Sequence, residues 1–258
     1  MKCLKMRISF DSAAEFYDRT RGPPRHIMEL LIKTLISELS GYRTILDAGV
    51  GTGRFAKPLQ DNGFEIVGID IAKKMINKAS EKGVCNLLLG DACFVPFKDG
   101  SFDVALCVHL LHLISGWETA LREICKVTKD IMVSIHYTRR NPIREAYNSL
   151  IGTYGYTSRR LGKGEWELKD LVKPSKSVFV ASYKGSADER LDYLGQRAYS
   201  SQWEIPEDVN RRVVYELKRR FAGKLFPQEL RLLVWDIGDL KAYCDASIIR
   251  ILGKKNET

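Results

Sequence analysis

The chain has 258 residues, 45% of them hydrophobic and 28% charged, which is typical of a globular protein with a sizeable core. No apolar stretch approaches the roughly 18 residues that a membrane span needs, and the charged N-terminus MKCLKMRISF is unlike a secretory signal. The six cysteines contain no C-x-x-C pair, which predicts reduced thiols, no metal site and a cytoplasmic location.

The first 40 residues combine an aromatic, charged stretch with a helical pattern. Residues 16–22, FYDRTRG, predict either a lid over a ligand site or a surface helix with one aromatic side chain packed down. From about Arg25 the apolar residues follow a helical period, and Pro23 and Pro24 favour a helix start there.

A glycine-rich corner follows the first predicted strand, residues 44–47. After Asp47, three glycines stand at alternate positions, 49, 51 and 53, and a helical pattern begins. A strand, a glycine turn and a helix form a ligand-binding corner in open α/β sheets. A P-loop is excluded because no Gly-Lys-Ser/Thr follows. A dinucleotide fingerprint remains open, because G-x-G-x-x-A fits from Gly51 to Ala56.

Four more predicted strands end in residues able to bind a ligand. Residues 65–70 end in Asp70, which is placed to accept both hydroxyls of a ribose or to cap the next helix. Residues 86–89 lead to Asp91, which is placed to accept an adenine amino group or to form a turn. Two histidines, His109 and His112, follow residues 104–108, and residues 131–135 end at His136 and Tyr137.

Strands that alternate with helical stretches predict an α/β protein with a parallel, doubly wound sheet. The second half adds predicted helices at 142–151, 188–199 and 206–222, and strands at 177–183 and 230–236. Its insertions are expected to cover the carboxyl edge of the sheet as a substrate cap.

Five segments carry a family resemblance, in order and at compatible spacings: YDRTRGPP, ILDAGVGTGRF, IVGIDIAKKMI, GDACFVPFKDGSFDVALCVHLLHLI and ALREICKV. Residues 17–137 resemble the class I S-adenosylmethionine (SAM) dependent methyltransferases, specifically the small-molecule group that includes quinone-biosynthesis enzymes. The resemblance implies a Rossmann-like, seven-stranded, mostly parallel sheet with an antiparallel last strand and helical cap insertions. It divides the chain into lid helices (1–40), a SAM-binding core (41–138), a cap insertion (139–176) and strands six and seven with inserted cap helices (177–258).

The resemblance also implies the cofactor, SAM, with S-adenosylhomocysteine (SAH) as product, and residues that bind it. The methionine end would be bordered by Asp47, Gly49 and Gly51, and the ribose held by Asp70. The adenine would contact Ile71, Asp91 and Ala92, and the sulfonium region would lie beside His109.

Methyl transfer to a small-molecule O, N or C nucleophile needs alignment, exclusion of water and, for a protonated nucleophile, a base. Histidine is the usual base near neutral pH, so the candidates are His109 and His136 at strand ends. The residues expected to line the substrate site are Tyr17, Arg21, His112, Tyr137 and Arg197.

Charge leaves other functions open. Residues 139–258 hold 23 Lys and Arg against 16 Asp and Glu, part of a net charge of +9 for the whole chain. This excess indicates either a solvated helix face or a tRNA or other RNA methyltransferase. A non-catalytic SAM-binding or activator subunit and a nucleotide oxidoreductase are further alternatives.

Overall fold

The computed structural model describes residues 10–11, 13–137, 142–158 and 161–253; for residues 248–253 it describes the backbone alone. Its centre is one seven-stranded sheet of order β3-β2-β1-β4-β5-β7-β6. The strands are β1 Thr44–Ala48, β2 Glu65–Asp70, β3 Leu87–Leu89, β4 Phe102–Cys107, β5 Thr128–Tyr137, β6 Lys176–Ser186 and β7 Leu225–Asp236. Strands β1 to β5 are parallel, and β7 pairs antiparallel with both β5 and β6. The predicted fold class is confirmed.

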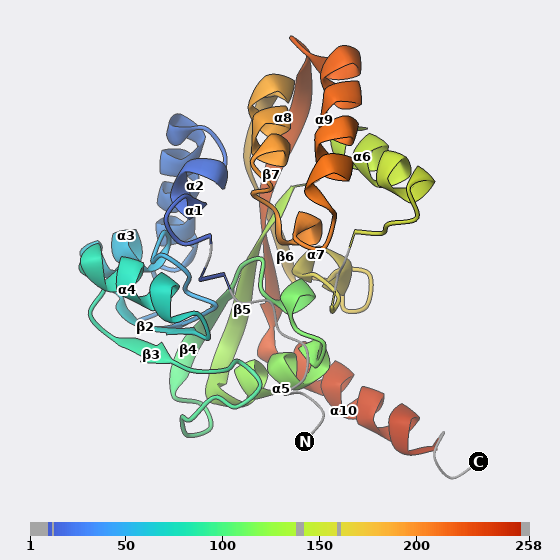
Figure 1. Cartoon of the computed structure of the whole chain (residues 1–258). Helices are drawn as coiled ribbons and strands as arrows, with labels where there is room; N and C mark the ends of the chain where they lie inside the picture. Colours follow the sequence, from blue (N-terminus) through green and yellow to red (C-terminus); the bar gives the residue numbers. More distant parts are fainter. Residues whose placement is uncertain (1–9, 12, 138–141, 159–160, 254–258) are drawn as a thin grey trace.

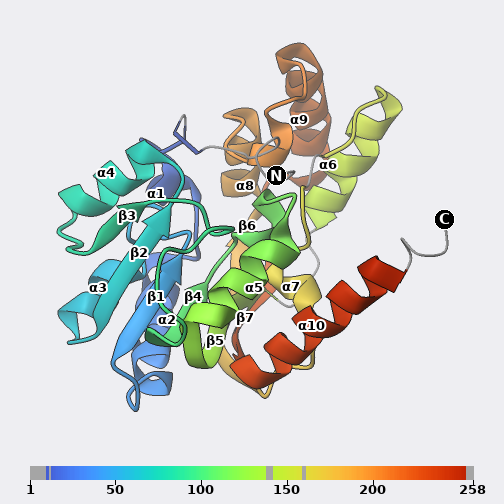
Figure 2. The same cartoon turned by 90° about the horizontal axis from the view of Figure 1, so that it is seen from below.

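Helices cover both faces of this sheet because successive strand residues point to opposite sides. Ile45 packs into a core with α2 Arg25–Glu38, α3 Ala56–Asp61 and α4 Lys73–Glu81. The next residue, Leu46, packs into the opposite core with α5 Trp117–Val127 and α10 Ile237–Gly253 (Figure 2). Burial of one strand between two helical layers explains why its sequence is a continuous apolar run.

Three helices form a separate structure above the sheet, which we call the cap: α6 Pro142–Thr153, α8 Ala187–Gly195 and α9 Glu207–Phe221 (Figure 1). They enclose their own apolar core, with Tyr147, Leu191 and Leu217 among its buried members. The long antiparallel strands β6 and β7 rise from the sheet to this cap, and α8 and α9 lie between them in the chain. The cap therefore adds a further core to the two of the sheet.

The shorter elements lie around the ligand-binding edge. Helix α1 Tyr17–Thr20 precedes α2, the 3-10 turn η2 Leu111–Leu113 follows β4, and α7 Glu165–Leu168 lies between α6 and β6. A second 3-10 turn, η3 Ser200–Gln202, joins α8 to α9. Within the described residues, no helix is long and apolar enough to cross a membrane.

Several element boundaries differ from the sequence-based expectations. Helix α8 ends at Gly195, short of the predicted residue 199, because Arg197 adopts a left-handed conformation (φ 54°). Strand β7 begins at Leu225, five residues before the prediction, because it pairs with β6 as far as Ser186. Helix α10 was not predicted at all.

Candidate active site

The glycine corner lies directly after β1, and each of its three glycines has a positive φ: 77° at Gly49, 55° at Gly51 and 73° at Gly53. Such angles are costly for residues with a Cβ. A Cβ at Gly49 would also lie 2.9 Å from a methyl carbon of Leu110. The N–H groups of Gly49 and Val50 donate to the carbonyl of Ile69, so the turn is fixed against β2. The spacing D-x-G-x-G-x-G therefore encodes the shape of this turn.

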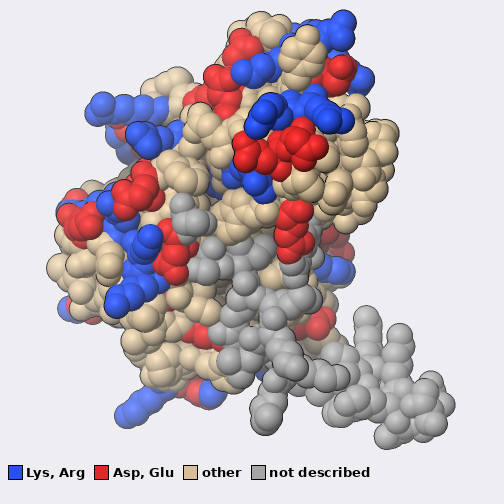
Figure 3. Space-filling view, viewed as in Figure 1, with Lys and Arg blue, Asp and Glu red and all other residues tan. Residues whose placement is uncertain are grey.

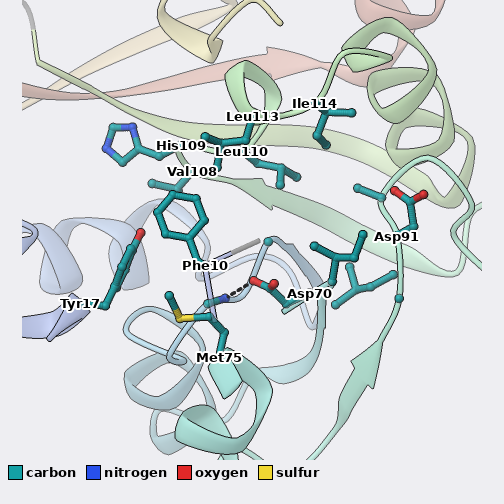
Figure 4. Close-up of a pocket in the computed structure, with 16 residues that line it drawn as sticks. Phe10, Tyr17, Asp70, Met75, Asp91, Val108, His109, Leu110, Leu113 and Ile114 are labelled. Carbon is teal, nitrogen blue, oxygen red and sulfur yellow. Dashed lines mark hydrogen bonds between the residues drawn. The ribbon is translucent and has the colours of Figure 1, made fainter. Parts of the chain in front are cut away.

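Asp70, at the end of β2, lies in the centre of the pocket wall (Figure 4). One carboxylate oxygen accepts a hydrogen bond from Gly51 N at 2.9 Å, and the other accepts one from Ala72 N at 2.8 Å. Burial raises the pKa of Asp70, while these two backbone hydrogen bonds oppose the rise. Since each oxygen has a second lone pair, the carboxylate retains capacity to accept from a ligand hydroxyl.

Asp47 is buried beneath the glycine corner, with 3% of its surface exposed. Its Oδ2 atom has no hydrogen-bond partner among the described residues. Burial, followed by the neighbouring charge of Asp70, raises the pKa of Asp47 to about 7. A buried carboxylate oxygen without a partner is costly, and a positively charged ligand group would satisfy it.

Asp91 lies on the far side of the pocket from Tyr17 (Figure 4), and the next residue, Ala92, also lines the pocket. They follow β3 through Gly90, and Asp91 Oδ1 accepts a hydrogen bond from Cys93 N at 3.0 Å. This bond closes the tight turn that holds the carboxylate at the pocket edge. Ile71, the residue after Asp70, also lines the pocket and is 41% exposed.

The chain after β4 forms the opposite wall, with Val108, His109 and Leu110. His109 has φ 57°, and its ring lies nearly parallel to that of Tyr137, with centroids 6.2 Å apart. Burial, together with the positive charges of Arg21, Arg54 and Arg144, lowers the pKa of His109 to about 4. His109 is therefore neutral at neutral pH and a weak proton acceptor.

The two other candidate histidines lie behind this wall. His112 is in η2, its ring centroid 5.0 Å from that of Trp166 and 6.5 Å from that of His109. His136, on β5, is not among the residues that line the pocket. Burial is the main cause that lowers the pKa of His136.

The N-terminal region closes the front of the pocket, where Phe10 and Tyr17 lie with ring centroids 5.9 Å apart. We call residues 13–21 the lid segment. Its Asp18 accepts a hydrogen bond from the hydroxyl of Thr52 at 2.6 Å, and it forms ion pairs with Arg54 and Lys82. The lid segment is thus attached to the glycine corner through one carboxylate.

The two arginines expected at the substrate site have different environments. Arg21 lies between the rings of Tyr17 and Tyr199, at 5.6 and 4.4 Å from their centroids. Arg197 is not among the pocket-lining residues, and its guanidinium donates to the carbonyls of Gln202, Trp203 and Ile205. These bonds give Arg197 a role in holding the loop between α8 and α9.

The pocket spans about 700 Å³ of space, part of it open to solvent. Its other walls are apolar, contributed by Ile69, Met75, Leu110, Leu113 and Ile114. Asp70 and Asp91 line the pocket, whereas Asp47 is buried beneath the glycine corner and is not among the lining residues. Together the two lining carboxylates and the unpartnered Oδ2 of Asp47 fit the hydroxyls, amines and ammonium of SAM. They disfavour the pyrophosphate of a dinucleotide, because the Gly51 N–H is occupied by Asp70 and acidic groups line the corner.

Sequence reasoning missed part of this site. Phe10 and Met75 carry no polar chemistry, so no motif singled them out. Glu165 was also missed; it follows two glycines in GKGEWE and is buried in the structure. Its Oε1 accepts hydrogen bonds from Leu110 N at 2.7 Å and Leu111 N at 3.0 Å, and from the thiol of Cys107. It therefore joins the cap insertion to the pocket wall.

Comparison with known proteins agrees with this geometry. Residues 46–131, one third of the chain, match the protein family described as a methyltransferase domain. The chain is 33% identical over 148 residues to the uncharacterized methyltransferase YcgJ of Bacillus subtilis, covering 54% of this chain and 58% of that protein. It is 27% identical over 152 residues to a demethylmenaquinone methyltransferase of Renibacterium salmoninarum, covering 55% and 63%. The match thus spans about three fifths of the length of these relatives.

A solved structure extends the likeness of the fold beyond the matched region. The crystal structure of YcgJ from Bacillus subtilis aligns over 81% of this chain and 96% of that chain, with a TM-score of 0.50 and 24% sequence identity. The strand order and the glycine corner agree with the sequence match of residues 46–131 to a methyltransferase domain. Over this region the chain is similar to class I SAM-dependent methyltransferases.

Proposed function

We propose that this protein transfers the methyl group of SAM to an O, N or C nucleophile of a small molecule. The observation that carries the proposal is the set of carboxylates around the glycine corner, above all the buried Asp47 oxygen without a described partner. SAM supplies the activated methyl group, so the protein must bind, orient and exclude water. The demethylmenaquinone methyltransferase among its relatives supports a small-molecule acceptor.

In this proposal Asp47, Gly49 and Gly51 bind the amino-acid end of SAM. Asp70 binds the ribose, and Ile71, Asp91 and Ala92 border the adenine. The wall of His109 and Leu110 borders the sulfur. Tyr17, Tyr137 and His112 are kept as candidates for the acceptor side, since their rings lie close to that wall or to the lid segment.

The low pKa of His109 limits its use as a base. At neutral pH its ring accepts a proton only weakly, and His136 has no place in the pocket lining. The proposal therefore relies on the alignment of SAM and the acceptor. It favours an acceptor whose nucleophilic atom reacts without a strong base from the protein. A catalytic role for either histidine stays a prediction, as does the cytoplasmic location.

The RNA methyltransferase alternative receives less support. The basic side chains of α9 are in part paired: Arg211 with Glu207, Lys218 with Asp192 and Arg219 with Glu216. On the face seen in Figure 3, acidic and basic side chains are interspersed over the cap. Phosphate contacts would make RNA binding fall steeply with added salt, so a salt series with tRNA tests this alternative.

Calorimetry with SAH tests the proposed function. The wild type is expected to bind SAH, and Asp70→Ala to weaken binding by about tenfold or more, because the variant removes hydrogen-bond acceptors from the pocket. Asp99→Ala is the matched control, since Asp99 is exposed and pairs with Lys126 far from the pocket. Wild-type protein that does not bind SAH would refute the proposal. Binding of SAH without turnover of any acceptor would leave only the non-catalytic alternative.

A further inference from the structure

Arg21 carries a buried positive charge that no described carboxylate neutralises. Its Nη2 atom donates to the carbonyl of Ala198 at 2.6 Å, which attaches the lid segment to the loop after α8. Its Nη1 atom is buried and has no hydrogen-bond partner among the described residues. A buried guanidinium donor without an acceptor is costly, and an anion is the group that satisfies it best.

The surroundings of Arg21 are aromatic and positively charged. The rings of Tyr17 and Tyr199 flank its guanidinium, and Arg54 and Arg190 add like charges nearby. Burial lowers the pKa of Arg21 below its usual value; Tyr17 and Tyr199 oppose this, and Arg54 and Arg190 add to it. The guanidinium stays charged at neutral pH all the same. The closest acid of the lid segment, Asp18, is engaged with Arg54, Lys82 and Thr52.

Arg21 is not itself among the residues that line the pocket, but its guanidinium contacts the ring of Tyr17. Tyr17 lines the pocket opposite Asp91 (Figure 4). Arg21 is also the charged residue that depresses the pKa of His109 most, after burial. The wall that borders the sulfur region therefore lies within the field of the Arg21 guanidinium.

We propose that Arg21 binds a carboxylate of the methyl acceptor, and that the acceptor is a small aromatic acid whose ring packs among Tyr17, Tyr199 and the stacked pair His109 and Tyr137. The inference rests on the proposed function and names the substrate class of the same pocket. Flat aromatic walls stabilise a planar ring, and the guanidinium fixes its orientation. The carboxylate serves for binding, so the nucleophile is another atom of the acceptor.

The test uses benzoate as the probe, with SAH present at saturation. Ligand-observed NMR is expected to detect benzoate bound to the wild type and benzamide, its neutral analogue, bound at least about tenfold more weakly. Arg21→Gln should weaken benzoate by about the same factor, and Arg21→Lys should keep part of the affinity because it keeps the charge. Arg25→Gln is the matched control, because Arg25 is four residues away and its side chain is 93% exposed.

The outcomes separate this inference from the proposed function. Equal binding of benzoate and benzamide to the wild type would refute the inference, even if Arg21→Gln failed to fold. So would a loss of SAH affinity in Arg21→Gln that leaves 5′-methylthioadenosine unaffected, since the anion would then be the carboxylate of the cofactor. If SAH binds and benzoate does not, the substrate class is wrong and the methyltransferase proposal stands. If SAH does not bind, the methyltransferase proposal itself fails.

Discussion

At the scale of single residues, the aspartates at the ends of β1 and β2 differ because their surroundings differ. The carboxylate of Asp70 accepts hydrogen bonds from two backbone N–H groups. Asp47 is more deeply buried, and one of its carboxylate oxygens has no hydrogen-bond partner among the described residues. Asp47 is therefore the group that changes most when a cation enters the corner. The sequence shows both residues as equivalent acids at strand ends, and only their burial distinguishes them.

Asp47 should make ligand binding depend on pH. Its pKa is raised to about 7, so between about pH 4 and pH 7 the folded protein binds more protons at this site than the unfolded chain does. The stability of the ligand-free protein is therefore expected to fall as pH rises through that window. The ammonium of SAH favours ionised Asp47, so its affinity should rise several-fold between about pH 6 and about pH 8.

Calorimetry at the two pH values checks this expectation. The Asp47→Asn variant should bind SAH more weakly and lose most of the pH dependence, while Asp61→Asn, an exposed acid of α3, should behave as the wild type. A wild-type affinity that is independent of pH would show that Asp47 does not contact the ammonium group.

At the scale of elements, two short segments from distant parts of the chain are attached around the pocket: the lid segment supplies Tyr17 to its lining, and α7 holds the wall after β4. The lid segment is attached through Asp18, and α7 is attached through Glu165. Each attachment depends on one carboxylate that receives several hydrogen bonds. Replacing one of these carboxylates is therefore expected to loosen the whole segment that it attaches.

The lid segment should loosen when Asp18 is replaced. Burial would raise the pKa of Asp18, but hydrogen bonds from Lys82 and Thr52 hold it below its usual value. The stabilisation that ionised Asp18 gives the folded protein is therefore present above about pH 4. It is lost as pH falls through the lowered pKa of Asp18 in the folded state. Asp18→Ala is expected to increase hydrogen exchange in residues 13–21 at neutral pH, with an SAH affinity reduced a few-fold. Unchanged exchange in that segment would contradict the role given to Asp18.

Glu165 should stabilise the wall after β4. Glu165→Ala removes the acceptor of two backbone N–H groups, one of them on the fully buried Leu111, and is expected to cost about 2–5 kcal/mol. That loss corresponds to a melting temperature lower by roughly 4–10 °C. Glu165→Gln keeps an acceptor oxygen and should lose much less. Thermal unfolding of the two variants checks the prediction, and equal losses would show that the carboxylate charge matters more than its acceptor geometry.

At the scale of the whole molecule, the cap and the sheet have separate cores. The cap is held by apolar packing and by a buried amide network in which Asn210 accepts from Tyr147 and Gln202 and donates to the carbonyl of Leu194. The cofactor corner, by contrast, is built on β1, β2 and the turns that follow them. Partial unfolding of the cap is therefore not expected to unfold the glycine corner.

Asn210→Ala tests this independence. The variant leaves Tyr147 and Gln202 without a shared acceptor and should destabilise the cap by about 2–4 kcal/mol, seen as faster hydrogen exchange in α6, α8 and α9. SAH affinity should stay within about threefold of the wild type, since no cap core residue lines the cofactor pocket. The exposed Asn148→Ala on α6 is the control. A large loss of SAH affinity would show that cap and corner form one cooperative unit.

The sequence by itself determined the sheet, the strand ends and the position of the glycine corner. Each of these follows from local patterns: apolar runs, glycines at alternate positions, and an acid at a strand end. Helix α10 was not predicted, because it begins at Ile237, directly after β7 ends at Asp236, with no glycine or proline between them.

Only the tertiary structure decided how distant residues meet. It brought Glu165 to Leu110 across 55 positions and Arg21 to Ala198 across 177. It also lowered the pKa of His109 and raised that of Asp47, which sequence reasoning had treated as an ordinary base and an ordinary acid. Burial and the field of neighbouring charges depend on the packing of the whole chain, and no local pattern of residues contains them.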